Sequence, residues 1–467
     1  MARSLSRRAF LTGLVTWAGT AALLSSCRSG ENETPGDQGP ASGTRSSPTL
    51  PATTGTPAVV SSTGSRVRVV YWGSFSGALG EAEQAVVQRF NESQDDVELE
   101  YQFQGSYEET AQKLAQAVAA RQTPDVVLLS DVWWFKFYLN GVIAPLDDFF
   151  QARQIDLADY VDPLINEGIR EGSVYWVPFA RSTPLFYYNK EAWSEAGLPD
   201  RGPRTWDEFR QWVPELVRSD GGTTTRYAFA HPNAASYIAW LFQGVIWQFG
   251  GRYSDPDFTI RLAEPAGVEA GQFYRSTVAE GWAVASQDPN ADFVNGLTAA
   301  MMASTASLGG LSRSAPFEVG TAFLPEGPAG FGCCTGGSGL AILADKPREI
   351  QEAAFNYLAF ATSTETTIFW SQSTGYMPVR KSAVESEEMK RFYEENPNFR
   401  TAVEQLPKTR PQDAARVFIP NGDQIIGKGL ERVTINQEEP QVVFAEVAQT
   451  LESEAQPVLA QLAQRER

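Results

Sequence analysis

The chain has 467 residues, 56 of them acidic and 38 basic, and its formal net charge is −18. A surface this acidic repels phosphate backbones, which argues against a nucleic-acid-binding protein. The single histidine, His231, also argues against a histidine-based metal site or catalytic triad, and we expect no cofactor.

The N-terminal residues have the features of an export signal. Ser6–Leu11 carries a twin-arginine pattern, and the apolar run Leu11–Leu24 is short for a membrane span. Leu24-Ser25-Ser26-Cys27 resembles a bacterial lipobox, in which cleavage precedes an acylated cysteine. The alternative is an uncleaved membrane anchor, and both place the folded part outside, facing the periplasm or the exterior. We predict a signal peptide over 1–26 and lipidation at Cys27.

A composition change separates the leader from the folded region. Residues 27–65 are rich in Ser, Thr, Gly and Pro and have almost no large apolar side chain. Such a segment cannot bury enough surface to order itself, so we predict a flexible tether to the membrane. The roughly 400 residues that follow exceed what one hydrophobic core usually supports, which predicts two lobes.

Strands alternate with helices from the start of the folded region. Val67–Trp72 and Asp125–Leu129 are typical of buried strands, and Val97–Tyr101 alternates like a half-buried one. Apolar residues at helical spacing lie from Leu79 to Phe90, and a second helix is expected from Tyr107 to Ala120. This order predicts an α/β lobe with a largely parallel sheet.

The alternation continues through the middle of the chain, and the C-terminal part is almost wholly helical from Glu385. Pro347 opens an amphipathic helix, and a long helix after Pro440 should kink at Pro457. Further strands are predicted at Val174–Phe179, Leu185–Tyr188, Ala299–Ala303 and Gly339–Ala344, and further helices near Trp206–Val217 and Ala234–Gln248.

Six short motifs follow one another in an order that resembles a known family. Each is weak evidence alone, but together they span residues 67–433 and resemble the family 1 extracellular solute-binding proteins of ABC importers, especially the glycerol-3-phosphate-binding branch. The motifs are Tyr71–Ser74, Gly105–Tyr107, Thr123–Asp131, Pro178–Lys190, Thr335–Ser338 and Thr374–Val379.

The resemblance implies a two-lobed periplasmic-binding-protein fold with an interlobe cleft and a helical C-terminal region. The first lobe would comprise residues 66–181 and 336–379, and the second 182–335 and 380–467. The strand pattern agrees, because ligands of open α/β sheets bind in a crevice at strand ends. We therefore expect a monomeric substrate-binding lipoprotein that captures a sugar, polyol or glycerophosphodiester and delivers it to a permease.

The resemblance also implies the ligand-binding residues. A polyol needs hydrogen-bonding partners for its hydroxyls and an aromatic face for its C–H side. Asp131 has a rival role as a helix N-cap, and the register between Ser304 and Ser307 stays open. Trp134 is expected in the core. The motifs give Tyr107, Asp131, Ser182, Ser304, Gly337 and Tyr376, and we add Trp133 and Tyr237 as cleft residues.

The charge of the ligand is a separate question. Members of the branch that bind glycerol-3-phosphate clamp the phosphate with an arginine shortly after an Asn-containing loop. Alignment on Asn421 puts Ile426 at that place, and no arginine lies between Arg416 and Arg432. We therefore predict a neutral sugar, an oligosaccharide or a glycerophosphodiester ahead of glycerol-3-phosphate, with Arg181 as the substitute cation.

Two local motifs favour ordinary structural roles. Gly422–Gly429 nearly matches a phosphate-binding loop, but Gly429 replaces the Ser or Thr that would hold magnesium, so a loop leading into a helix is sufficient. Cys333 and Cys334 could form a disulfide only with a distorted ring, which favours two buried thiols. In an oxidising compartment the strained disulfide is the alternative.

Two other classes of function compete with transport. An exported glycoside hydrolase would need a pair of carboxylates across a cleft, and nothing in the sequence selects such a pair. The G-x-S-x-G motif of many esterases does not occur either. A sensory binding lipoprotein without a transport role is the other alternative. We expect a binding protein and not an enzyme.

Overall fold

The computed structural model describes residues 66–233 and 237–465, so the predicted signal peptide, tether and Cys27 lie outside the described residues. Gly64–Arg467 forms one compact unit built around two β-sheets. Within 66–233 and 237–465, no helix combines the length and apolarity that crossing a bilayer requires. We call the halves built around the two sheets the first and second lobes.

The first sheet contains five strands, and only one of them is reversed. β1 runs parallel to β2 and β3, whereas β13 runs antiparallel to β3 and β6. The sheet is therefore mixed, with two parallel and two antiparallel neighbouring pairs, and the prediction of a largely parallel sheet is only partly right. The order across the sheet is β2 (Val97–Phe103), β1 (Val67–Gly73), β3 (Val126–Ser130), β13 (Gly336–Ile342) and β6 (Val177–Ser182).

The second sheet repeats this arrangement. β9 runs parallel to β10 and β11, whereas β7 runs antiparallel to β11 and β12. Among the five strands of each main path, the reversed strand is the one by which the chain enters from the other lobe, and in the second sheet the added edge strand β8 also runs antiparallel to β9. The order is β10 (Ala283–Ser286), β9 (Thr223–Pro232), β11 (Thr298–Ser304), β7 (Pro184–Asn189) and β12 (Val319–Ala322), with β8 (Arg218–Asp220) paired to β9.

Helices cover both faces of the first sheet because strands such as β3 are apolar on both sides. Along β3, Val126 and Leu128 belong to the core cluster shared with α1 (Gly77–Ser93) and α12 (Arg348–Ala361). The alternate residues Val127 and Leu129 pack in a different cluster. That second cluster is shared with α2 (Tyr107–Ala120) and α3 (Trp134–Leu139).

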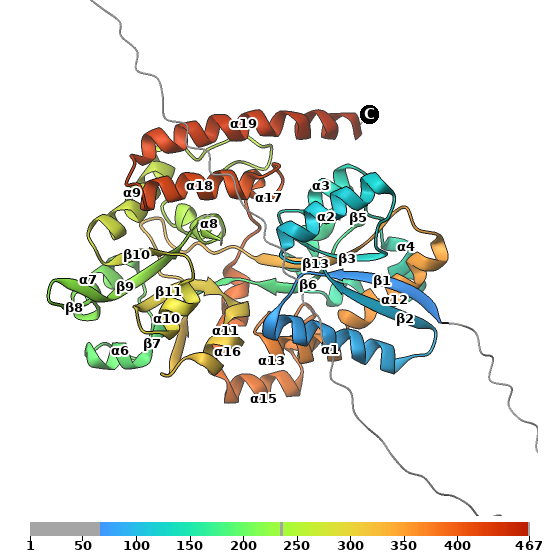
Figure 1. Cartoon of the computed structure of the whole chain (residues 1–467), viewed down its shortest axis with the longest axis horizontal. Helices are drawn as coiled ribbons and strands as arrows, with labels where there is room; N and C mark the ends of the chain where they lie inside the picture. Colours follow the sequence, from blue (N-terminus) through green and yellow to red (C-terminus); the bar gives the residue numbers. More distant parts are fainter. Residues whose placement is uncertain (1–65, 234–236, 466–467) are drawn as a thin grey trace, which may run out of the picture. The chain divides into compact units, whose positions relative to one another are not determined.

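The second sheet shares its main apolar core with helices from two parts of the chain. Phe186, Phe229 and Met302 face this core, and the helices carry apolar residues that fill it. Figure 1 shows α18 and α19 beside α8 and α9. These helices are α7 (Trp206–Leu216), α8 (Ile238–Gln248), α9 (Pro265–Ala279), α18 (Gly422–Thr434) and α19 (Pro440–Arg465).

Shorter elements connect these layers. The two-stranded sheet is formed by β4 and β5 and precedes the first crossing between lobes. The remaining strands and α-helices of the described residues are β4 (Ile169–Arg170), β5 (Ser173–Val174), α4 (Asp147–Ala152), α5 (Asp162–Ile165), α6 (Lys190–Glu195), α10 (Pro289–Val294), α11 (Leu308–Ser314), α13 (Thr364–Thr374), α14 (Lys381–Val384), α15 (Glu387–Glu395), α16 (Pro397–Gln405) and α17 (Ala414–Val417).

Some predicted boundaries are wrong. The predicted strand Val174–Phe179 is interrupted, because Trp176 turns into the core between β5 and β6 and donates its indole N–H to the carbonyl of Leu129. The predicted strand Gly339–Ala344 begins earlier, at Gly336, because the crossing segment already pairs with β6. The helix predicted at Ala234–Gln248 starts at Ile238 in the described part.

Three crossing segments join the lobes side by side. Thr183 links β6 to β7, Thr335 leads into β13, and the backbone N–H of Met377 donates to the carbonyl of Arg181 at 2.8 Å. Cys333 and Cys334, just before the second crossing, are buried free thiols, as predicted.

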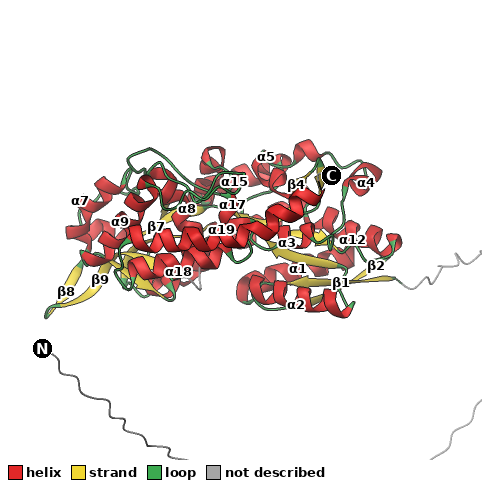
Figure 2. Cartoon of the chain, turned by 90° about the horizontal axis from the view of Figure 1, so that it is seen from above, coloured by secondary structure: helices red, strands yellow, loops and turns green. Residues whose placement is uncertain are grey.

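The C-terminal helix α19 contacts both lobes. It continues through Pro457 without a break. Its earlier turns pack on the second lobe through Val443 and Phe444, whereas Val458 joins the core around α3. The Arg465 guanidinium donates to the carbonyl of Tyr138 at 2.9 Å. Figure 2 shows α19 running from beside α18 toward the end of the chain on the first-lobe side.

Candidate functional site

A cleft of about 1250 Å³ lies between the lobes and is lined by residues of both. Its lining comes from the C-terminal ends of β1, β3 and β11, the start of α2, the crossing segments and α18. The structure brings together eight of the nine predicted ligand-binding residues in this lining, namely Tyr107, Asp131, Trp133, Ser182, Tyr237, Ser304, Gly337 and Tyr376.

Two tyrosines from distant parts of the chain form the first-lobe wall. Tyr107 begins α2, and its hydroxyl lies 3.1 Å from Ser338 Oγ and 3.4 Å from the hydroxyl of Tyr376. The Tyr376 ring stacks on Trp370 with 5.7 Å between centroids. Burial raises the pKa of Tyr107 well above its usual range and that of Tyr376 to about 12. Both phenols therefore stay protonated and can donate hydrogen bonds.

Asp131 projects its carboxylate into the cleft from the end of β3. Its backbone N–H donates to the carbonyl of Gly337 at 2.9 Å, which joins the two strand ends. The rival role as a helix N-cap is wrong, because α3 starts at Trp134 with Trp133 as its N-cap residue. The Asp131 carboxylate instead accepts a hydrogen bond from Gln412.

Gly337 allows the crossing strand to approach β6 closely. Its φ is +109°, and a Cβ here would lie 2.1 Å from the carbonyl oxygen of Ala180. Only glycine fits both the conformation and the space. The Gly337 backbone therefore borders the cleft close to Ser182, with no side chain of its own.

The second-lobe wall supplies aromatic rings and hydroxyls. Tyr237 and Trp240 meet edge to face at 6.0 Å, and the Trp240 indole donates to the carbonyl of Thr335. Ser304 ends β11 and lines the cleft, whereas the Ser307 hydroxyl accepts from Asn290 and is not part of the lining. The structure thereby fixes the register that the sequence left open.

The two tryptophans after Asp131 separate as predicted. Trp133 lines the cleft, with the Lys136 ammonium 5.8 Å from its ring. Trp134 is buried and stacks on Trp176 with 5.7 Å between ring centroids.

Arg181, the predicted substitute cation, does not line the cleft. It is fully buried, its guanidinium pairs with the Glu167 carboxylate, and it lies 4.9 Å from the Trp176 ring. Glu167 also accepts from the Thr335 hydroxyl. In a strand, successive side chains point to opposite faces, so Arg181 faces away when Ser182 faces the cleft.

The cleft nevertheless contains an arginine, which the sequence alignment missed. Arg416, at α17, lines it together with Asp423 and Lys428 of α18. Ile426, which the alignment put in the arginine's place, is buried in the second-lobe core. The sequence does carry a signal for the cleft face of α18, because its polar residues Gln424, Lys428 and Glu431 recur at i, i+4 and i+7. All three line the cleft.

Arg416 is held by carboxylates from both lobes. Its Nε donates to Asp423 Oδ1 at 2.6 Å, and its Nη1 lies 3.6 Å from Asp131 Oδ2. Burial lowers the pKa of the Arg416 guanidinium, but Asp423 and Asp131 outweigh this effect and raise it. The guanidinium therefore stays charged while two anions share its charge.

The whole lining carries more negative than positive charge. Its basic residues are Lys113, Arg416 and Lys428, and its acidic residues are Glu108, Glu109, Asp131, Asp423 and Glu431. This lining offers hydroxyl donors and acceptors, aromatic faces and one strongly held cation.

Comparison with known proteins agrees with this architecture. The model of the bacterial extracellular solute-binding protein family matches residues 85–401. The crystal structure of UgpB from Mycobacterium tuberculosis in complex with glycerophosphocholine has 43% sequence identity and a TM-score of 0.79, covering 84% of this chain and 99% of that one.

More distant proteins are also similar to this chain. The sn-glycerol-3-phosphate-binding periplasmic protein UgpB of Escherichia coli is 26% identical over 395 residues, which cover 80% of this chain and 89% of that protein. The acarbose-binding GacH receptor of Streptomyces glaucescens has 20% identity and a TM-score of 0.73, covering 83% of this chain and 98% of that one.

Proposed function

Because this chain belongs to the family of bacterial extracellular solute-binding proteins, we propose that it captures a small polar solute in the cleft and delivers it to an ABC importer. The family consists of binding proteins and not of enzymes. The three adjacent crossing segments support a hinge between the lobes, about which the cleft opens and closes around its ligand. We take 66–181 with 336–379, and 182–335 with 380–467, as the two moving lobes.

The proposed ligand is a glycerophosphodiester such as glycerophosphocholine. The observation that carries this proposal is the buried Arg416, whose charge is already shared by Asp131 and Asp423. A diester brings one negative charge, which Arg416 can accept. A monoester brings up to two, and the excess of carboxylates in the lining repels the second. The relative crystallised with glycerophosphocholine supports the same ligand class.

Each wall then has its own task. The hydroxyls of Tyr107, Tyr376 and Ser182, with the Asp131 carboxylate, bind the glycerol hydroxyls. Arg416 hydrogen-bonds the phosphodiester oxygens, which are its natural partners. The remaining aromatic faces of Trp133 and Tyr237 cover the apolar side of the ligand's headgroup.

Calorimetry with three ligands tests this assignment. We expect glycerophosphocholine to bind at least tenfold more tightly than glycerol-3-phosphate, and maltose to bind weakly. A thermal shift offers an independent check, because a ligand at 100 times its dissociation constant adds about 2.7 kcal/mol. Tight binding of maltose with no binding of the diester would assign the cleft to a sugar. Tighter binding of the monoester would refute the charge argument.

We also propose that Cys27 carries the lipid that anchors the protein to the outer face of the membrane. The lipobox-like Leu24–Cys27 and the tether composition support this proposal. Stable anchoring needs more than one acyl chain, which acylation of such a cysteine supplies. Cys27→Ala should release the protein or leave it unprocessed. A wild-type protein found wholly in the soluble exported fraction would contradict the anchor.

A further inference from the structure

The side chain of Gln412 joins a residue of one lobe to a residue of the other. Its amide nitrogen donates to Asp131 Oδ2 at 2.5 Å, and its amide oxygen accepts from the Arg416 guanidinium. Asp131 belongs to the end of β3 in the first lobe, and Arg416 belongs to α17 against the second lobe. Gln412 is buried and is not part of the cleft lining, so it acts through these two neighbours.

We propose that Gln412 is a positioning residue that couples lobe closure to the arrangement of the ligand-binding charges. This inference rests on the proposed function, since it concerns how the same cleft orients Asp131 and Arg416. When the lobes close, one amide connects the Asp131 carboxylate to the Arg416 guanidinium. When they open, the hydrogen bond between Gln412 and Asp131 breaks.

The amide of Gln412 satisfies both neighbours because it carries a donor and an acceptor. Asp131 is an acceptor and requires a donor, whereas Arg416 is a donor and requires an acceptor. A glutamate at 412 could accept from Arg416 but would repel Asp131. A methionine would fill a similar volume and provide neither bond. The identity of residue 412 is therefore matched to the charges on both sides.

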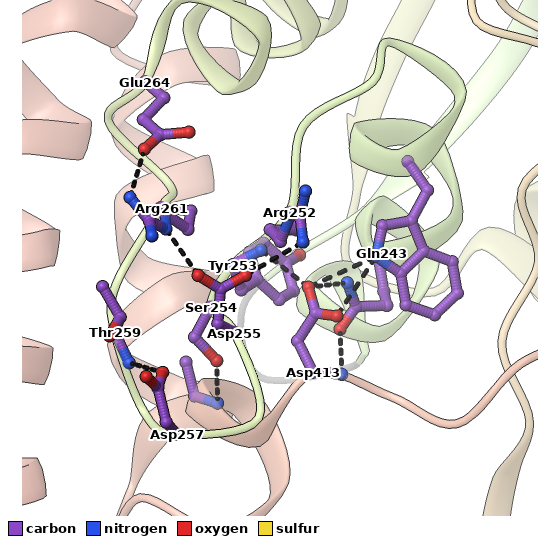
Figure 3. Close-up of polar contacts among 12 residues, drawn as sticks. Gln243, Arg252, Tyr253, Ser254, Asp255, Asp257, Thr259, Arg261, Glu264 and Asp413 are labelled. Carbon is purple, nitrogen blue, oxygen red and sulfur yellow. Dashed lines mark hydrogen bonds and ion pairs between the residues drawn. The ribbon is translucent and has the colours of Figure 1, made fainter.

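The second lobe holds Gln412 in place through the next residue, Asp413. Figure 3 shows the Asp413 carboxylate surrounded by donors, and its Oδ2 accepts from Gln243 at 2.8 Å and from the backbone N–H of Tyr253 at 2.7 Å. The backbone N–H of Asp413 donates back to Gln243 Oε1 at 3.1 Å. Ala415 N–H donates to Ser254 Oγ at 2.8 Å. These bonds fix the segment around Gln412 before it meets Asp131.

A matched control is available on α8. Gln248 is also a buried glutamine with both amide groups bonded, to Trp206 Nε1 at 2.7 Å and to the Gly332 carbonyl at 2.9 Å. Both partners belong to the second lobe. Gln248→Met should therefore destabilise the fold without changing the relation between the lobes, whereas Gln412→Met should change that relation.

The experiment measures the distance between spin labels at Glu81 on α1 and Glu269 on α9, both exposed, in soluble protein that carries Cys27→Ser. Without ligand, Gln412→Met and Gln412→Glu should shift the distance distribution toward longer values, the glutamate further. Affinity for glycerophosphocholine should fall about tenfold for Gln412→Met, the loss of a hydrogen bond to a charged group, and more for Gln412→Glu. Gln248→Met should leave both readouts unchanged.

The outcomes separate this inference from the proposed function. If the wild type fails to bind glycerophosphocholine, the proposed ligand is wrong, and the ligand-free distances still test the interlobe link. If Gln412→Met and Gln412→Glu give wild-type distances, the coupling is refuted. The same conclusion follows if Gln248→Met shifts the distances as much as Gln412→Met does.

Discussion

Arg181 and Arg416 lie in two regions that bury a cation for different purposes. Arg181 lies at the first crossing, where one carboxylate, that of Glu167, and the face of Trp176 enclose its guanidinium. Arg416 lies at the second-lobe wall, where carboxylates from both lobes share its charge and its side chain still lines the cleft. Both arginines are less than a tenth exposed.

The difference shows that burial does not identify a ligand-binding cation. The ion pair between Arg181 and Glu167 lies inside the crossing region and forms without any solute. Arg416 shares its charge between two carboxylates and remains within reach of the cleft. The four predictions below separate charges that maintain the fold from charges that serve the ligand.

The largest expected effect is on stability at the first crossing. Arg181→Met leaves Glu167 buried without its cation, and breaking such a pair costs about 3–5 kcal/mol of the free energy of unfolding. Urea denaturation measures this loss. The double variant Arg181→Met with Glu167→Gln should recover part of it, because no unpaired charge remains. Wild-type stability in Arg181→Met would remove the contrast with Arg416.

A buried carboxylate with tyrosine partners sharpens the contrast through pH. The hydroxyls of Tyr71 and Tyr101 hydrogen-bond Glu83, at 2.5 and 2.8 Å. Burial, opposed by these bonds, raises the pKa of Glu83 from 4.5 to about 7. The folded state keeps this proton where the unfolded chain releases it. The stabilisation that comes from retaining the Glu83 proton is therefore complete below pH 4.5. Its loss between pH 4.5 and 7 lowers the free energy of unfolding by about 3 kcal/mol.

Urea denaturation across this pH range checks the Glu83 prediction. Glu83→Gln carries no titrating proton, so its stability should lack this component and the difference from wild type should change with pH. A difference that stays constant from pH 4.5 to 8 would show that Glu83 does not titrate in this way.

At the cleft, Arg416→Met should mainly reduce affinity. The ligand loses its charged hydrogen bonds and faces two uncompensated carboxylates, so binding of glycerophosphocholine should weaken about a hundredfold. Calorimetry measures the dissociation constant. Arg416→Lys should recover only part, because an ammonium cannot donate in parallel. A larger loss of binding in folded Arg181→Met than in Arg416→Met would reverse the assignment of the two arginines.

The smallest effect is expected for a single hydroxyl of the first-lobe wall. Tyr376→Phe keeps the ring stacked on Trp370 and removes one hydrogen bond, so affinity should fall about fivefold, on the order of 1 kcal/mol. Tyr393→Phe is a suitable control, because Tyr393 packs in a separate apolar cluster away from the cleft. Equal affinities for Tyr376→Phe and wild type would exclude a role for this hydroxyl in binding.

Sequence periodicity is sufficient to predict the helices and strands that are buried on one side or on all sides. The helix predicted from Tyr107 to Ala120 has those bounds in the structure, where Ser106 and Glu109 form a capping box at its start. The family resemblance predicts Asp131 and Gly337 as cleft residues, and both line the cleft. The interrupted strand at Trp176 was missed because a tryptophan that leaves the strand to fill a core has the same composition as one within it.

Sequence alignment could not place the charged residues that Arg416 and α18 contribute to the cleft. A shift along α18 exchanges a residue of its cleft face, such as Lys428, for one of its core face, such as Ile426. Arg416 lies before that helix, in a segment with no regular pattern, and its position depends on the bonds of Asp413. Such tertiary hydrogen bonds leave no period in the sequence.

The position of β13 in the first sheet determines the order in which the molecule can fold. β13 lies between β3 and β6, yet Gly336–Ile342 is synthesised long after both. Until it arrives, β3 has one edge without a partner and β6 has no partner in the sheet, and exposed edges favour association with other chains. Contacts this distant in sequence also form slowly. A nascent chain that stops before Gly336 therefore cannot complete the first sheet, so a secreted fragment of this length should aggregate, whereas the whole chain should not.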